Sequence, residues 1–427
     1  MTTASALTYL HLADEMEQVL RRHVMEAWFP VCVNPEGGFT QDFDRRWQRG
    51  SSSDSLLEFQ ARQTRVAAML AIAYPNEGRW QEYAIHGLRY LRDVMWDVRD
   101  GGWFWTTDAR GRPLAGATKH SHASAYAIQS AALVFQASGE RWALEHAEEG
   151  FSWLSSYAHD EQFGGLHGWL TRDGSVISSP ADVPEGAGPL DPMGHDVGLK
   201  DANVLGDWFE ALLDLAANST LPRVRELLLE SAQLLLSKAT TINGELHYAF
   251  YNDWTPQPGL EWYGYGLQAQ HRLLTAARLL PELPGLEARA WATGSHALKR
   301  ARHRSGGFLY AGQGGSDPVV EGIDTRVPVK SWWVQIEAVR ALVLCSAREP
   351  EPGPYSRLLF PHWRFFTENF LDQRFGGLFS AQGADRRTWR SLARRDGLAA
   401  RKARPWKDAS HETSSLLQSI GVLRGHS

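Results

Sequence analysis

A glycine-aromatic motif recurs six times along the chain and constrains its fold more than any other feature. Two of the copies read "DGGWFWTTDARG" and "FGGLFSAQG". The six copies are marked by Gly37, Gly101, Gly164, Gly244, Gly306 and Gly376. These glycines lie 62 to 80 residues apart. A regular period of this kind indicates a repeat architecture rather than a string of unrelated domains.

The segments between the glycine motifs read as helices. "HASAYAIQSAALVFQAS" and "WWVQIEAVRALVLCSA" carry apolar residues at positions i, i+3, i+4 and i+7. Each glycine pair, followed by an aromatic residue or Leu, indicates a short strand and a turn, and the copy at Gly244 is a degenerate one. We therefore predict an all-α fold, a single (α/α)6 barrel of about twelve helices with short β-turn hairpins. It is expected to form one catalytic domain over residues 1–427. An open helical solenoid is the alternative, but these units are too long for a tetratricopeptide array and contain β-turn segments.

Composition excludes several classes of protein. A hydrophobic fraction of 43% and an aromatic fraction of 11% exclude disorder. The net charge of -5 provides neither a basic surface for nucleic acid nor a polybasic patch for lipid. Cys32 and Cys345 form no motif. The chain shows no signal peptide and no apolar run long enough to span a membrane. We expect a cytoplasmic monomer or homodimer that contacts neither nucleic acid nor membrane.

The stretch "KDANVLGDWFEALLDL", residues 200–215, combines a helical pattern with a line of polar residues. Asn203, Asp207 and Glu210 are spaced i, i+4 and i+7, so they share one helix face. That face must look either into water or into a polar cavity. Other predicted helix starts and adjoining loops carry Arg62, His122, Trp332, Trp333, Glu337, Trp406 and His411.

In an (α/α)6 barrel, the first residues of the inner helices and the adjoining loops face a central cleft. The chain is rich in Trp, with 18 among 427 residues. Aromatic planes beside Arg, His and carboxylate groups suit a sugar, because its apolar faces stack while its hydroxyls need fixed donors and acceptors. The predicted ligand is therefore a mono- or disaccharide.

Several motifs resemble those of the N-acylglucosamine 2-epimerase superfamily, which includes cellobiose 2-epimerases and mannose isomerases. They are "ARQTR", "KSWWVQIEA" and "WKDASH". The resemblance implies that Arg62 contacts the substrate, that Trp406 stacks on the sugar and that His411 is an acid/base. It also carries over Trp332, Trp333 and Glu337. It implies a sugar epimerase or isomerase that needs no cofactor and no metal.

Two expected histidines are absent from their motif positions. Asp207 stands where the family has a catalytic His, with Asn203 and Glu210 around it. The second motif is a Gly-His followed by a Glu three residues on, and it corresponds to "PGLEWYGYGLQAQHRLL". The nearest match places Gly266 or Leu267 at the His and Ala269 or Gln270 at the Glu, with His271 close by.

The reaction implied by the resemblance removes a proton beside a sugar carbonyl, for which a base with a pKa near 7, such as His, is best. Epimerisation needs acid/base groups on both faces of C2, whereas isomerisation can reuse one. An ordinary Asp is a poor base, but burial beside Trp208 and Phe209 would raise its pKa. We expect Asp207 to point into the cleft, partly buried, and to act with His411 and His271.

Two alternatives remain open from the sequence. One is a carbohydrate hydrolase or lyase that uses Asp207 as its acid/base. The other is a sugar-binding protein without catalysis. The segment "PMGHDVGLKD" also holds His195, Asp196 and Asp201, but its spacing matches no standard metal site. The Pro/Gly-rich stretch 178–198 is expected to be a loop at the cleft entrance, for instance a lid.

Overall fold

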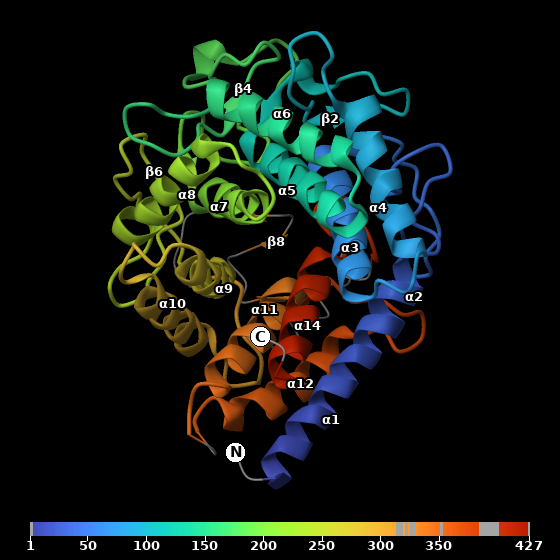
Figure 1. The fold of residues 1–427 in the computed structure, drawn as a ribbon, viewed down its shortest axis with the longest axis vertical. Coiled ribbons are helices and arrows are strands. Elements are labelled where there is room, and N and C mark those ends of the chain that lie inside the picture. Colours follow the sequence, from blue (N-terminus) through green and yellow to red (C-terminus); the bar gives the residue numbers. More distant parts are fainter. Residues whose placement is uncertain are drawn as a thin grey trace.

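A computed structural model describes residues 3–312, 319–320, 323–324, 329–350, 353–383 and 401–425. About 54% of the described residues are helical. An inner ring consists of α3 (Leu57–Ala73), α5 (Ser121–Ser138), α7 (Ala202–Ala216), α9 (Tyr263–Leu279), α11 (Trp332–Ser346) and α14 (Ser410–Leu423). The outer layer consists of α4 (Arg79–Tyr90), α6 (Arg141–Tyr157), α8 (Pro222–Leu234), α10 (Leu286–Ala301), α12 (Ser356–Phe370) and α1 (Thr3–Val19). Figure 1 shows the two layers around a common centre.

The sequence of each helix determines the layer in which it lies. From Ser121 to Val134, every residue of α5 is buried, and most of them are small or apolar. A helix without a polar face is stable only when it is surrounded by protein. In contrast, α6 buries one stripe that includes Leu144, Phe151 and Leu154 and leaves its other face to solvent. The inner helices therefore form the core that the outer helices cover.

The two ends of the chain close the ring. The outer helix α1 packs against α14, which also packs against α3 and α11. The sixth helix pair is thus assembled from the first and last helices of the chain, as Figure 1 shows. Closure confirms the predicted (α/α)6 barrel and excludes the open solenoid.

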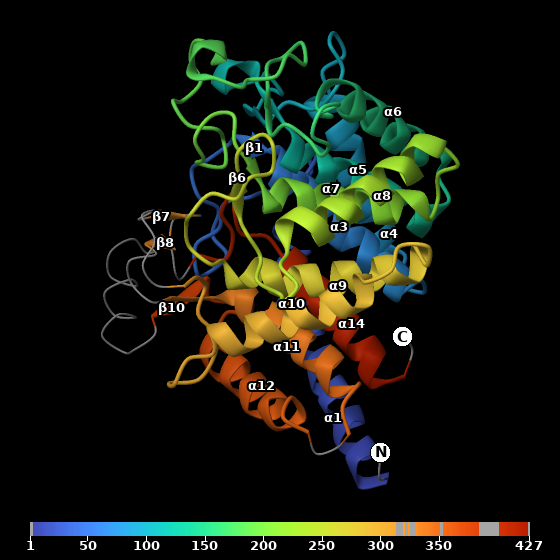
Figure 2. The ribbon, with the colours of Figure 1, turned by 90° about the vertical axis from the view of Figure 1, so that its left-hand side faces the viewer.

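Short antiparallel strand pairs lie between successive units. The pairs are β1 (Ser55–Leu56) with β2 (Thr106–Thr107), β3 (Lys119–His120) with β4 (Trp169–Leu170), β5 (Lys200–Asp201) with β6 (Ala249–Phe250), β7 (Val319–Val320) with β8 (Ile323–Asp324), and β9 (Val329–Ser331) with β10 (Ala381–Gly383). Figure 2 shows β1, β6, β7, β8 and β10 on one side of the ring. Because β1, β3, β5 and β9 lead directly into inner helices, that side holds the inner helices' N-terminal ends.

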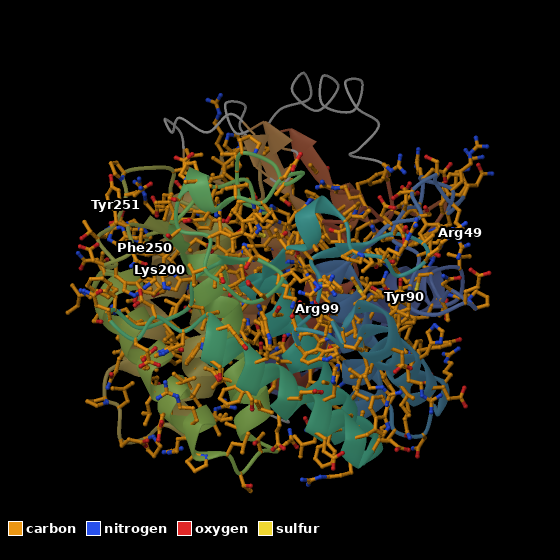
Figure 3. All side chains as sticks on the ribbon, turned by 90° about the horizontal axis from the view of Figure 1, so that it is seen from above. Arg49, Tyr90, Arg99, Lys200, Phe250 and Tyr251 are labelled. Atoms are coloured by element: carbon orange, nitrogen blue, oxygen red, sulfur yellow. The ribbon has the colours of Figure 1, made fainter. Side chains whose placement is uncertain are left out.

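The glycine motifs form the predicted turns. Gly101 and Gly102 have φ angles of 72° and 70°, and a Cβ on Gly101 would lie 2.5 Å from the ring of Trp153. Only glycine fits there. The Asp that begins this kind of turn pairs with a buried Lys, as in Asp160 with Lys200 at 2.6 Å. Figure 3 shows Lys200 close to Phe250, its partner across the β5–β6 pair.

Within the described residues, no helix combines the length and the apolar character that a membrane crossing requires.

Candidate active site

A small pocket, here called the front pocket, lies at the N-terminal ends of the inner helices. Its volume is about 20 Å³, which is room for about one water molecule. All the inner helices contribute to it. The lining residues are Glu58, Arg62, His122, Tyr126, Met193, Asn203, Tyr265, Gln268, Trp332, Trp333, Trp406 and His411.

Most of the residues singled out in the sequence meet in this pocket, although they come from different repeats. They are Arg62, His122, Asn203, Trp332, Trp333, Trp406 and His411. Asp207 and Glu337 lie directly behind it, each in contact with a pocket histidine. Glu210 and His271 lie elsewhere, in a second cavity.

His411 is held by a buried carboxylate. Its Nδ1 lies 2.9 Å from Oε1 of Glu337, and its ring stacks on Trp333 with centroids 5.1 Å apart. Burial alone would raise the pKa of Glu337, but Arg340 and His411 lower it to about 2. Glu337 is therefore ionised and fixes one ring nitrogen, which leaves Nε2 of His411 for a bound molecule.

His122 lies between two carboxylates. Its Nδ1 is 2.7 Å from Oδ2 of Asp207, and its Nε2 is 3.2 Å from Oε2 of Glu58. Burial would lower the pKa of His122, but Glu58 and Asp207 raise it to about 10. His122 is thus a cation at neutral pH, able to donate a hydrogen bond but not to accept a proton.

The expectation for Asp207 was wrong in two respects. Asp207 is fully buried, at 1% exposure, and it lies beneath His122 rather than in the cleft. Burial would raise the pKa of its carboxyl, but Arg272 and His122 lower it instead. Nη2 of Arg272 is 2.5 Å from Oδ1 of Asp207, which also accepts a hydrogen bond from Tyr126 at 3.0 Å. Asp207 is therefore an ionised support for His122.

Arg62 presents a fixed positive charge to the pocket. Its guanidinium lies 2.6 Å from Oε1 of Glu58 and 3.0 Å from Oδ2 of Asp408. The guanidinium is also 5.2 Å from the centre of the Tyr126 ring. These contacts orient Arg62 before any ligand binds.

Sequence reasoning missed Tyr265 and Gln268, both of which line the pocket from α9. They follow Gly264 with the spacing of the expected Gly-His-x-x-Glu pattern, but with Tyr and Gln in place of His and Glu. The residues of the nearest sequence match, Gly266 or Leu267 and Ala269 or Gln270, do not line the pocket. Leu267 is in the core, and Gln270 donates to Cys345. The only available signal was a glycine followed by two polar residues at i, i+3 spacing.

Glu210 and His271 line a separate cavity at the C-terminal ends of the inner helices, here called the rear cavity. Glu210 lies 2.5 Å from Arg65 and 2.8 Å from Arg272. Burial lowers the pKa of His271 well below its ordinary value, and Arg340 adds to this effect. Glu210 and His271 therefore do not line the front pocket with the other predicted residues.

The loop 178–198 reaches the pocket through Met193. It is anchored by His195, which lies 3.6 Å from Asp201 and 3.2 Å from the Tyr248 hydroxyl. Among the residues that the structure describes, no cluster of His, Cys, Asp or Glu is arranged to hold a metal ion.

Comparison with known proteins supports one family. The sequence profile of N-acylglucosamine 2-epimerase (GlcNAc 2-epimerase) matches residues 37–177. The chain is 25% identical to a cellobiose 2-epimerase of Bacteroides fragilis, over 96% of this chain and 99% of that one. It is 24% identical to a D-mannose isomerase of Marinomonas mediterranea, over 86% and 90% of the two chains. The fold matches the structure of cellobiose 2-epimerase from Spirochaeta thermophila with a TM-score of 0.81, 22% identity, and coverage of 100% and 99%.

Proposed function

This chain belongs to the N-acylglucosamine 2-epimerase superfamily, and on that basis we propose that it is an aldose–ketose isomerase acting on a reducing sugar. The observation that carries the proposal is the pairing of His411 with Glu337 at 2.9 Å, with His411 lining the pocket. The His411 ring is the base. Aromatic and polar groups around it supply the stacking surface and hydrogen bonds that a sugar needs.

The proposed reaction moves one proton from carbon to carbon. Nε2 of His411 removes the proton from C2 of the open-chain aldose while O1 gains a proton, which gives an enediol. The same nitrogen then returns the proton to C1 while O2 loses its proton, which gives the ketose. Arg62 and the His122 cation stabilise the negative charge that develops on the oxygens.

One base suffices for this reaction, and that is why isomerisation is favoured over epimerisation. Inversion at C2 needs a second acid/base on the opposite face of the carbon. His122 cannot serve as that base at neutral pH because Glu58 and Asp207 keep it protonated. Asn203 and Gln268, which also line the pocket, do not titrate.

A hydrolase built on Asp207 fits the geometry less well. Asp207 is buried behind His122 and paired with Arg272. Glu58, the carboxylate that lines the pocket, is itself held by Arg62 and His122. A hydrolase needs a carboxylic acid that can protonate the leaving oxygen, and both carboxylates are held ionised by cations.

A substrate must displace part of the pocket wall, since the free volume holds about one water. Met193 lies on a loop, and Trp406 is half-buried in the segment before α14. We propose that these two side chains move when a sugar binds.

The test is incubation with mannose, glucose, fructose, cellobiose and lactose in deuterated water, followed by NMR. The proposal predicts interconversion of at least one aldose with its ketose. Formation of the C2 epimer without ketose would replace isomerisation with epimerisation. Cleavage of cellobiose or lactose would establish the hydrolase, and binding without reaction would establish a sugar-binding protein.

A further inference from the structure

The rear cavity has the features of a ligand site separate from the front pocket. Its volume is about 340 Å³. Like the front pocket, it is lined by every inner helix, but by residues nearer their C-terminal ends. Its lining residues are Arg65, Met69, Ile72, Ala73, Leu133, Glu210, Leu213, Asp214, His271, Arg272, Thr275, Arg340, Ser414, Leu417 and Gln418.

Three arginines line the deep part of the cavity. Arg65, Arg272 and Arg340 come from three different helices and are all buried. Glu210 bridges two of them, at 2.5 Å from Arg65 and 2.8 Å from Arg272. The second carboxyl is that of Asp214. Burial and the nearby Glu210 raise its pKa to about 6. The three guanidinium groups are thus paired with Glu210, Asp207 and Glu337, and the further carboxyl of Asp214 becomes neutral in mild acid.

Two donors in this deep part have no partner. Among the described residues, Nε of Arg65 and Nε of Arg340 are buried without a hydrogen-bond partner. The ring of His271, 9% exposed, lines the cavity beside them. A buried polar group without a partner destabilises the fold by about 1–3 kcal/mol, so each such group points to a missing acceptor.

The mouth of the cavity is apolar. Ile72 is 38% exposed, and Met69 and Leu417 are half-buried beside it. A ligand that fits both parts carries an anionic head and an apolar tail.

We infer that the rear cavity binds a small organic carboxylate, with its head among Arg65, Arg340 and His271 and its tail along Met69, Ile72 and Leu417. Guanidinium groups bind carboxylates through charge-assisted, often paired, hydrogen bonds. The apolar tail distinguishes this ligand from inorganic phosphate. The inference does not depend on the reaction proposed for the front pocket.

The site is connected to the front pocket by two ion-pair chains. Arg340 contacts Glu337, which holds His411. Arg272 contacts Asp207, which holds His122. A carboxylate that shares Arg340 weakens its contact with Glu337, so a rear ligand is expected to change turnover in the front pocket. This coupling, unlike the binding itself, rests on the proposed function.

The test is isothermal titration calorimetry of the whole protein with benzoate as the probe. Benzamide has the same shape without the charge, and inorganic phosphate has the charge without the tail. The expected result is saturable binding of one benzoate per chain, at least tenfold tighter than either control compound. Affinity is expected to rise as the pH falls through about 6, because Asp214, which faces Glu210, Arg65 and Gln129, then becomes neutral.

Two variants locate the binding. His271→Phe keeps an aromatic ring but removes its nitrogens, and Gln418→Trp adds a large side chain to the cavity wall and leaves the three arginines in the sequence. Each is expected to weaken benzoate binding at least tenfold, whereas Trp406→Ala in the front pocket leaves it unchanged. The inference is overturned if benzoate does not bind, if benzamide or phosphate binds as tightly, or if Trp406→Ala rather than Gln418→Trp abolishes binding.

Discussion

The front pocket and the rear cavity are built on the same inner helices, yet their chemistry differs. The front pocket has Trp and Tyr rings and two histidines, and each histidine contacts a buried carboxylate. The rear cavity has three arginines, His271 and an aliphatic mouth. The front is smaller and more enclosed by aromatic rings, whereas the rear has about 340 Å³ of space.

This difference arises from the contacts of two carboxylates, Asp207 and Glu337, that lie between the two cavities. Asp207 and Glu337 each contact a histidine toward the front and an arginine toward the rear. The arginines keep the carboxylates ionised, as the low pKa of about 2 for Glu337 shows. The rear arginines therefore keep ionised the two carboxylates, Asp207 and Glu337, that hold the front histidines.

The largest expected effect is on turnover when His411 is changed. His411→Gln retains hydrogen bonding but removes the base, so turnover should fall by about 10²–10⁴-fold, the usual contribution of a general base. Sugar affinity should change little. Steady-state kinetics with the best sugar of the panel measures both. The matched control is His86→Gln on the outer helix α4, which should retain activity; a fully active His411→Gln enzyme would refute the assignment.

The next effect is on stability when Asp207 is changed. Asp207→Asn removes the anion that buried Arg272 and His122 share and leaves them only Glu210 and Glu58, and loss of one member of a buried ion pair costs about 3–5 kcal/mol. Urea unfolding measures the free energy of unfolding. The exposed Asp54→Asn serves as the control and should change it by no more than about 0.5 kcal/mol. Equal unfolding midpoints for the two variants would show that Asp207 does not link the two cavities.

A smaller effect concerns the pH dependence of stability. The pKa of His122 is about 10 in the folded protein, whereas the ordinary value for His is 6.5. Because the folded pKa is raised, the stabilisation from His122 is complete below about 6.5 and is lost as the pH rises toward 10. Within that range, wild type should lose about 1.4 kcal/mol per pH unit more than His122→Gln. Unfolding curves for both proteins at several pH values would reveal the difference, and parallel pH profiles would exclude a charged His122.

The smallest effect is expected at Tyr265. If one base is enough, Tyr265→Phe removes a hydroxyl but no catalytic proton, and turnover should fall by less than about tenfold, well below the scale of a lost general acid. A loss of a hundredfold or more with unchanged sugar affinity would make Tyr265 a second acid/base. That outcome would favour epimerisation.

The fold followed from the sequence because glycine turns and helical patterns are local and recur six times. Part of the front pocket could also be predicted from the sequence, because Arg62, Trp332 and His411 begin their helices or lie near the start. The position of a residue along the barrel axis could not be predicted. Asn203 and Glu210 share one helix face, but seven residues separate them, which is about 10 Å along the axis. That distance places one in the front pocket and the other in the rear cavity.

The protonation state of Asp207 could not be predicted from the sequence for a related reason. Local sequence placed Asp207 beside Trp208 and Phe209, which suggested a raised pKa. The groups that determine its charge, His122 and Arg272, come from other repeats and meet it only in the closed ring. Tyr265 and Gln268 could not be recognised from the sequence for a different reason. They stand where the family pattern has His and Glu.

The central claim is that a single base, His411, serves both C1 and C2 of the sugar. The most direct test uses the best aldose of the panel, deuterated at C2, with the reaction run in ordinary water. One base that removes and returns the same hydrogen should deliver part of the deuterium to C1 of the ketose, detectable by NMR and mass spectrometry. A C2 epimer that has lost all its deuterium to solvent, with no labelled ketose, would contradict the account and require a second base in the front pocket.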